Sequence, residues 1–228
     1  MLVKNWMSKN VIAIDINDSM QEAIRLLKEN DIKMMPVLKK GKLVGIITDR
    51  DLKRASASDA TTLDVHELLF LVSKIKIKDI MTKDPIMIPE DFTVEETAEI
   101  LLKNKISGAP VTDNEGKVVG TITQTDLFKV LISLTGVGTK GIQFAFLLED
   151  SPGSIKTIAD IIRKYSGRIV SILTSYRNAT QGYRKVYIRM YDIERTEIEK
   201  LKGELREKAT LLYMVDHQKN KREIYSSK

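Results

Sequence analysis

The sequence has 228 residues, of which 43% are hydrophobic and 30% are charged, and its formal net charge is +6. This composition is typical of a globular protein that is long enough to bury a sizeable core. The absence of cysteine excludes disulfides, thiolate metal sites and thiol catalysis, and two histidines are too few for a histidine metal cluster. The longest apolar run, Leu68–Val72, is too short to span a bilayer, and Met1–Asn10 lacks the apolar stretch of a secretion signal. We therefore expect a cytoplasmic protein without a cofactor or a metal.

An internal repeat covers residues 1–132 and keeps its register from end to end. The first matches are 74 residues apart, and the offset becomes 75 after the turn at Thr112–Gly116, where a hairpin tolerates one inserted residue. The aligned pairs are Trp6–Ile12 with Ile80–Ile86, Ser19–Ile24 with Thr93–Ala98, Met35–Val37 with Ala109–Val111, Gly45–Thr48 with Gly120–Thr123, and Asp51-Leu52 with Asp126-Leu127. A fixed period of this length predicts two copies of one structural unit.

Each copy predicts the order β-α-β-β-α. Ser19 and Thr93 are followed three residues later by Glu22 and Glu96, a capping-box pattern that begins a helix. Apolar residues at helical spacing come next, and two strand-like segments separated by a glycine turn follow them. The helical stripes are Met20, Ala23, Ile24 and Leu27 in the first copy and Val94, Ala98 and Leu101 in the second, and the strands are Met34–Leu38, Leu43–Ile47, Ala109–Thr112 and Val118–Ile122. Residues 57–76 predict a helix that connects the copies, in which His66 is expected to have no functional role.

The second half of the chain follows a different pattern. Residues 136–141 are rich in glycine and predict a linker, and residues 142–216 predict the ferredoxin-like order β-α-β-β-α-β. The expected strands are Ile142–Leu148, Arg168–Tyr176, Lys185–Tyr191 and Ala209–Val215, and the second of the two helices is expected at Glu194–Lys208. Ser151 is expected to cap the first helix, with Pro152 at its first position. Residues 217–228 hold four basic residues against one glutamate and are expected to form a frayed tail.

Both halves resemble known families. The first resembles a pair of CBS motifs, the arrangement called a Bateman module, in the segments Val3–Ser8, Ile77–Thr82, Gly45–Leu52 and Gly120–Leu127 and in the two Pro-Val strands. The second resembles an ACT domain, a small regulatory module, in Leu148–Ser154 and in the order of its elements. The whole chain resembles the CBS–ACT proteins of the acetoin-utilisation type. The resemblance implies an α+β protein with a CBS pair at 1–135 (motif one 1–56, motif two 77–132) and an ACT-like domain at 142–216.

Two Thr-x-x-Asp pairs, Thr48 with Asp51 and Thr123 with Asp126, stand where helices are expected to begin. Helix capping alone explains either pair, but their recurrence at matching positions favours a binding role. A helix N-terminus attracts phosphate through its free N–H groups and its dipole, and an aspartate can accept both hydroxyls of a ribose. By resemblance to ligand-binding CBS proteins, these four residues would bind an adenine nucleotide (AMP, ADP or ATP) or the related S-adenosylmethionine as a regulatory ligand.

Further candidates follow from the same resemblance. The residues that would contact adenine are Val11 and Ile12 in the first copy and Pro85 and Ile86 in the second, and Ser8 and Thr82 would each add a hydroxyl. Arg50 lies between Thr48 and Asp51 and would reach a phosphate, whereas the second copy has Thr125 at that position. The first cleft is therefore expected to take the more highly charged ligand. The candidates for adenine and the two added hydroxyls are equally explained as ordinary core or turn residues.

In the ACT-like half, the turn at Asp150–Ser154 is a candidate amino-acid site. Asp150 would face an ammonium group, and the backbone N–H groups of Gly153 and Ser154 would face a carboxylate. A well-capped helix explains the same residues without a ligand.

We expect a non-enzymatic sensor, because the sequence has no G-x-S-x-G or H-E-x-x-H motif and no nucleophile beside a base. We also expect the protein to form at least a homodimer and not to bind a membrane. Two alternatives stay open at this point. One is an oligomerisation or interaction protein that binds no ligand. The other is a nucleic-acid-binding regulator that uses the basic tail, although the weak net charge elsewhere makes nucleic acid the less favoured partner.

Overall fold

The computed structural model describes residues 1–57 and 73–225, and the chain forms two compact units, Met1–Phe128 and Lys129–Lys228. Most of the connecting helix predicted at 57–76, including His66, lies outside the described residues. The first unit contains one hydrophobic core for each copy of the repeat, and the second unit contains a third core. Within the described ranges, no helix is long and apolar enough to cross a membrane, and no group of acidic or histidine side chains is arranged to hold a metal ion.

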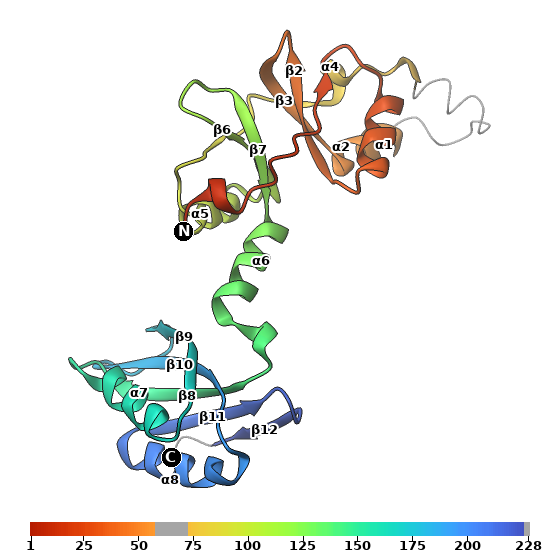
Figure 1. The fold of residues 1–228 in the computed structure, drawn as a ribbon. Helices are drawn as coiled ribbons and strands as arrows, with labels where there is room; N and C mark the ends of the chain where they lie inside the picture. The colour runs from red at the N-terminus through yellow and green to blue at the C-terminus, as the bar shows by residue number, and fades with distance from the viewer. Residues whose placement is uncertain (58–72, 226–228) are drawn as a thin grey trace. The chain divides into compact units, whose positions relative to one another are not determined.

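Both copies of the repeat fold in the predicted order (Figure 1). The first contains β1 (Ile14–Asp15), α1 (Met20–Glu29), β2 (Met34–Lys39), β3 (Lys42–Thr48) and α2 (Asp49–Ala57). The second contains β5 (Ile88–Pro89), α5 (Val94–Asn104), β6 (Gly108–Thr112), β7 (Val118–Thr123) and α6 (Gln124–Thr135). In each copy the first strand pairs in parallel with the second, which forms an antiparallel hairpin with the third. The apolar stripe of α1 is narrower than predicted, because Ile24 is 39% exposed.

The segment that precedes each copy packs on the other copy. Ser8 forms a β-bridge with Thr121 of β7, and β4 (Thr82–Lys83) pairs with β3. Val3 is fully buried in the core of the second copy, and Ile77 is fully buried in the core of the first. The repeat pattern does not predict this exchange, because it sets the register of each copy without indicating which neighbour receives the leading segment.

Two glycines allow the exchanged segments to lie directly on the strands. A Cβ atom at Gly45 would lie 2.8 Å from the carbonyl oxygen of Thr82, and one at Gly120 would lie 2.9 Å from the carbonyl oxygen of Ser8. Glycine within a strand often marks a close approach of another backbone, which is its role at both positions.

The predicted capping box is complete in the second copy and only half formed in the first. Thr93 Oγ1 accepts a hydrogen bond from the Glu96 N–H at 3.2 Å, and the Glu96 carboxylate accepts one from the Thr93 N–H at 2.8 Å. In the first copy Ser19 Oγ accepts from the Glu22 N–H at 3.2 Å, but the Glu22 carboxylate pairs with Arg25 instead. An arginine one turn along the helix thus competes with the N-cap for the carboxylate of Glu22.

The second unit is a five-stranded antiparallel sheet with two helices on one face (Figure 1). Its elements are β8 (Ile142–Glu149), α7 (Ser154–Lys164), β9 (Arg168–Ser175), β10 (Tyr183–Tyr191), α8 (Ile198–Lys208), β11 (Thr210–Asp216) and β12 (Lys221–Ile224). The order of the strands is β12-β11-β8-β10-β9. Alternate residues of β8 and β10, among them Phe144, Phe146 and Ile188, are buried in one core with α7 and α8, as the period of a strand requires.

The start of α7 differs from the prediction. Ser151 is not the N-cap and Pro152 is not the first helical residue, because Gly153 takes the N-cap position with a φ of 90°. The Ser154 N–H donates to the Ser151 carbonyl oxygen at 3.3 Å, which closes a turn around Pro152 and Gly153. Proline followed by glycine with positive φ is the preferred sequence of a type II turn. The proline therefore belongs to the turn before the helix.

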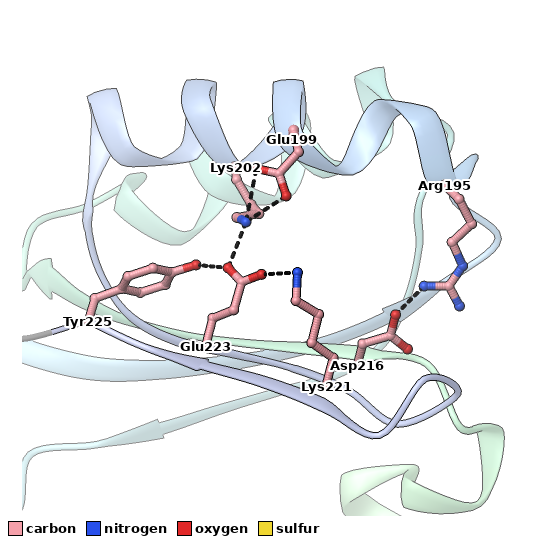
Figure 2. Close-up of polar contacts among 7 residues, drawn as sticks. All are labelled: Arg195, Glu199, Lys202, Asp216, Lys221, Glu223 and Tyr225. Atoms are coloured by element: carbon pink, nitrogen blue, oxygen red, sulfur yellow. Dashed lines mark hydrogen bonds and ion pairs between the residues drawn. The ribbon is translucent and has the colours of Figure 1, made fainter.

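The segment expected to be a frayed tail instead forms β12, which pairs with β11 at one edge of the sheet. Figure 2 shows the contacts that hold it: the Glu223 carboxylate accepts from Lys202 Nζ of α8 at 2.6 Å, and it lies 2.7 Å from Lys221 Nζ. The Tyr225 hydroxyl donates to the same carboxylate, and Lys202 Nζ also donates to Glu199 at 2.8 Å. Composition does not predict this cluster, because α8 and the tail meet only in the folded sheet.

The last turn of α6 and the residues after it belong to the second unit. The Thr135 carbonyl oxygen accepts from Arg189 Nε at 2.6 Å and from Ser171 Oγ at 3.1 Å. Gly136 follows with a φ of 61°, and the Val170 side chain occupies the space where a Cβ of residue 136 would stand. The linker predicted at 136–141 therefore begins with fixed contacts, and its middle forms a short 3-10 turn.

Candidate ligand-binding sites

The Thr-x-x-Asp pair of the first copy lies where β3 meets α2. Thr48 is the last residue of β3, and Asp51, in the first turn of α2, has a side chain that is 8% exposed. Asp51 Oδ2 accepts from the Thr48 N–H at 3.1 Å and from the Thr48 hydroxyl at 2.6 Å, and the same hydroxyl accepts from the Asp51 N–H at 3.2 Å. Arg54, one turn further along, donates to Asp51 Oδ1 at 3.0 Å. Both oxygens of this carboxylate are therefore held in place.

The second copy repeats this geometry at the junction of β7 and α6. Asp126 Oδ2 accepts from the Thr123 N–H at 3.0 Å and from the Thr123 hydroxyl at 2.7 Å, and Asp126 is 8% exposed. Each pair is thus a capping box with aspartate in the place of glutamate. Capping leaves acceptor capacity for a ligand, because each carboxylate oxygen has two lone pairs.

Because the leading segments are exchanged, two of the candidate hydroxyls lie against the copy to which they do not belong in sequence. Ser8, which comes from the first copy, bridges to Thr121 in β7, and Thr82, from the second, pairs with Ile46 in β3. Each partner lies two residues before the threonine that ends its strand. Ser8 therefore lies on the strand that leads to the second Thr-x-x-Asp pair and Thr82 on the strand that leads to the first, opposite to their order in the sequence.

The apolar candidates for adenine differ between the copies. Val11 and Ile12 are half-buried, and Ile12 packs against the core of the first copy. Pro85 is half-buried, but Ile86 is 37% exposed and Met87, which sequence analysis does not single out, is 49% exposed. The second copy therefore presents more exposed apolar surface in this segment.

The two helix starts also differ in how their charges are arranged. Arg50 and Thr125 occupy corresponding exposed positions in the first turns of α2 and α6. Arg50 adds a positive charge at the start of α2, but Asp49 beside it adds a negative one, whereas Gln124 and Thr125 at the start of α6 are uncharged. The two first turns therefore carry the same formal charge in different arrangements.

The turn before α7 brings together Asp150, Gly153 and Ser154, the candidates for an amino-acid site, and adds a residue that no sequence motif marks. Arg184 of β10 has its Nε 3.4 Å from Asp150 Oδ1, and its Nη2 donates to Ser154 Oγ at 3.1 Å. The Tyr176 hydroxyl donates to Asp150 Oδ1 at 3.4 Å. A cation of the protein already pairs with Asp150, which weakens its assignment as the ammonium ligand. Arg184 is the stronger candidate for a contact with a carboxylate.

Comparison with known proteins gives matches for the first part of this chain. The family model for the CBS domain matches residues 3–58 and 77–133. A CBS domain-containing protein of Dictyostelium discoideum is 34% identical over 134 residues, which are 58% of this chain and 92% of that protein.

Solved structures give matches of similar extent. The CBS domain pair of protein MJ0100, in complex with 5′-methylthioadenosine and S-adenosyl-L-methionine, is 35% identical with a TM-score of 0.50, and the match covers 57% of this chain and 99% of that one. A Vibrio cholerae protein described as an acetoin utilization protein (AcuB) is 24% identical with a TM-score of 0.51, covering 61% of this chain and 96% of that one. The second likeness concerns the fold alone.

Proposed function

We propose, from the premise that this chain belongs to the CBS-domain family, that it is a non-enzymatic regulatory protein whose two Thr-x-x-Asp clefts bind an adenine nucleotide or S-adenosylmethionine. The observation that carries the proposal is the recurrence of one threonine–aspartate geometry at the start of α2 and of α6. The MJ0100 pair, which is 35% identical to this chain, was solved with two ligands that both contain adenosine. Adenosine is therefore the chemical group that we expect the clefts to bind.

In the proposed complex each residue type has one task. Asp51 and Asp126 each accept a ribose hydroxyl, because a buried carboxylate forms strong charge-assisted hydrogen bonds. Thr48 and Thr123, which precede the first turns of their helices, face the 5′ substituent, where the helix dipole favours an anion. Thr82 joins the first cleft and Ser8 the second, in accordance with the exchanged segments.

Calorimetry on the full chain with AMP, ADP, ATP and S-adenosylmethionine tests this proposal. Asp51→Ala and Asp126→Ala should each weaken binding at one cleft by about 1.5–3 kcal/mol, which is roughly ten- to a hundredfold in affinity. Glu96→Ala is the matched control, because Glu96 is also the acidic member of a capping box but lies at the start of α5. If no ligand binds the unmodified chain, or if both aspartate variants bind like it, the protein is an interaction module in which these pairs only cap helices.

We further propose that the second unit is a ferredoxin-like domain of the ACT type. Its first four strands, numbered in chain order, lie in the order 4-1-3-2 with both helices on one face, which supports this assignment. An amino acid would bind at the turn before α7, with its carboxylate on Arg184 and on the N–H group of Gly153, because the Ser154 N–H already donates to Ser151 within the turn. A thermal-shift screen of amino acids tests this, with Arg184→Met expected to abolish any shift. Arg163→Met is the control, because Arg163 is an exposed partner of Asp160 on α7.

A homodimer is the assembly that the edges of the second unit support. β12 closes one edge with charged side chains, whereas β9 at the other edge has no charged side chain from Ile169 to Ser175. Long uncharged edge strands readily pair with another chain. We therefore expect β9 to pair with β9 of a second copy, and Ile172→Lys to convert a dimer into a monomer in light scattering. A mass near 25.8 kDa for the unmodified chain contradicts the proposal.

The part of α6 that belongs to the second unit offers another surface for self-association. Leu131, Ile132 and Leu134 are 54%, 55% and 43% exposed, an unusual density of apolar side chains for a short stretch of helix. Ile132→Lys tests this surface independently of β9. If only one of the two lysine variants dissociates the dimer, that variant identifies the dimerising surface.

A further inference from the structure

Arg54 contacts the one oxygen of the Asp51 carboxylate that the capping box leaves unused. Thr48 donates twice to Oδ2, whereas Arg54 Nη2 donates to Oδ1 at 3.0 Å. The Asp51 side chain is 8% exposed and the Arg54 side chain is 72% exposed. The guanidinium therefore pairs with the buried carboxylate from the solvent side.

The first two turns of α2 and α6 differ in their charged residues. Positions 49, 50, 53 and 54 are Asp49, Arg50, Lys53 and Arg54, whereas the corresponding residues of the second copy are Gln124, Thr125, Phe128 and Lys129. A lysine is a compact point charge and cannot reproduce the planar, multi-donor contact of an arginine. The aspartate of the first cleft thus pairs with an arginine at a position where the second copy has a lysine.

We propose that Arg54 is a specificity residue that makes the first cleft prefer adenosine ligands with a negatively charged 5′ group over those with a neutral or cationic one. The inference rests on the proposed function of the cleft. A ribose bound by Asp51 brings its 5′ substituent close to that carboxylate, and a phosphate there experiences repulsion unless the carboxylate is neutralised. Arg54 supplies the neutralising charge, and Oδ1 still has a lone pair for a ribose hydroxyl.

The sign of the effect depends on the charge of the ligand. Without Arg54, the Asp51 carboxylate loses its counter-ion, so an anionic 5′ group is repelled and a cationic one is attracted. AMP, 5′-methylthioadenosine and S-adenosylmethionine share the adenosine group and differ in 5′ charge, from about two negative charges through none to one net positive charge. A ratio of affinities within this series cancels any effect of the variant on the adenosine contacts.

The test is calorimetry of the three ligands with the full chain carrying Asp126→Ala, which leaves the first cleft as the reporting site. Adding Arg54→Gln should weaken AMP about three- to tenfold, change 5′-methylthioadenosine less than about twofold and strengthen S-adenosylmethionine, so that the AMP to S-adenosylmethionine ratio falls about tenfold. Arg54→Lys, which keeps the charge without the planar contact, should recover only part of the ratio. Lys53→Gln is the matched control, because it removes the same charge from the neighbouring position, where Lys53 contacts Asp49 at 3.3 Å.

Three outcomes overturn the inference. If Arg54→Gln weakens the binding of all three ligands equally, Arg54 only positions Asp51. If Lys53→Gln also changes the ratio of AMP to S-adenosylmethionine affinity tenfold, the net charge of the helix start sets the preference and the contact of Arg54 with Asp51 does not. If the unmodified chain binds a ligand and Asp126→Ala abolishes that binding entirely, the first cleft is not a binding site. If the unmodified chain binds none of the three ligands, it is the proposed function that fails. Melting of each variant is measured first, so that binding is compared on folded protein.

Discussion

Glu223→Gln should loosen the C-terminal strand and destabilise the second unit. Hydrogen bonds from Lys202, Lys221 and Tyr225 lower the pKa of Glu223 from 4.5 to about 2 (Figure 2). A shift of that size corresponds to about 3 kcal/mol. The Glu223 side chain is 19% exposed and that of Lys221 is 58% exposed, so screening by solvent reduces the expected loss to about 1–2 kcal/mol.

The burial of Lys202 explains why the loss should be measurable. Its side chain is 5% exposed, and without the Glu223 carboxylate its remaining acidic partner in the cluster is Glu199, whose side chain is 74% exposed. A buried cation that loses a close partner carries a desolvation cost that is no longer offset. Urea denaturation at pH 7, with amide exchange of β12, measures the effect. Glu199→Gln is the control and should cost less than about 0.5 kcal/mol, because the contact it removes is largely solvated.

The pH dependence has a definite sign. The pKa of Glu223 is lower in the folded state than in the unfolded state, so the ionised carboxylate stabilises the fold above pH 4.5 and this contribution disappears as the pH falls towards 2. The stability difference between the unmodified chain and Glu223→Gln should therefore shrink between about pH 5 and pH 2. A difference that stays constant over that range would refute the electrostatic argument and would leave packing of β12 as the cause.

Three further predictions test the fold by single and paired substitutions. Gly136→Ala should lower the free energy of unfolding by at least about 1–2 kcal/mol, because a left-handed φ strains an alanine and Val170 fills the space of the new Cβ. Adding Val170→Ala should recover only part of this loss in urea denaturation. Full recovery would contradict the backbone strain. Gly120→Ala should lower the Tm and the amide-exchange protection of Ser8, since the new Cβ would lie 2.9 Å from the Ser8 carbonyl oxygen. Unchanged protection would mean that the exchanged segment around Ser8 is not held against β7. Thr93→Ala should cost about 1 kcal/mol and Ser19→Ala less, because only the first breaks a complete capping box; equal losses would contradict the reciprocal contact.

The elements of the chain could be predicted because the signals for them are local. The repeat sets the order of helices and strands twice, and a capping pattern such as Thr93 with Glu96 lies within four residues of sequence. The CBS pair follows from such local signals, and the family match over residues 3–58 and 77–133 confirms it. The errors at Ile24 and Ser151 are also local, since Ile24 lies at the edge of its helical stripe and a Pro-Gly turn competes with a proline-initiated helix.

Contacts between distant segments could not be predicted in the same way. The exchange of Ser8 and Thr82 between copies depends on which neighbour each leading segment meets. Arg184 reaches Asp150 only because β10 pairs with β8, and Glu223 reaches Lys202 only because β12 extends the sheet beside α8. None of these pairs has a sequence spacing that a periodic pattern records.

The Thr-x-x-Asp pairs show why a correct motif can still leave function open. The hydrogen bonds that cap α2 also hold the Asp51 carboxylate in a fixed orientation at the start of the helix. A ligand that uses this carboxylate therefore meets a group whose orientation is already set, which reduces the entropy lost on binding. Capping and binding thus require the same residues at the same spacing, and stability measurements on Asp51 variants cannot separate them. A capping carboxylate at the start of a different helix, such as Glu96 of α5, separates the two roles: its loss should cost stability and leave ligand affinity unchanged.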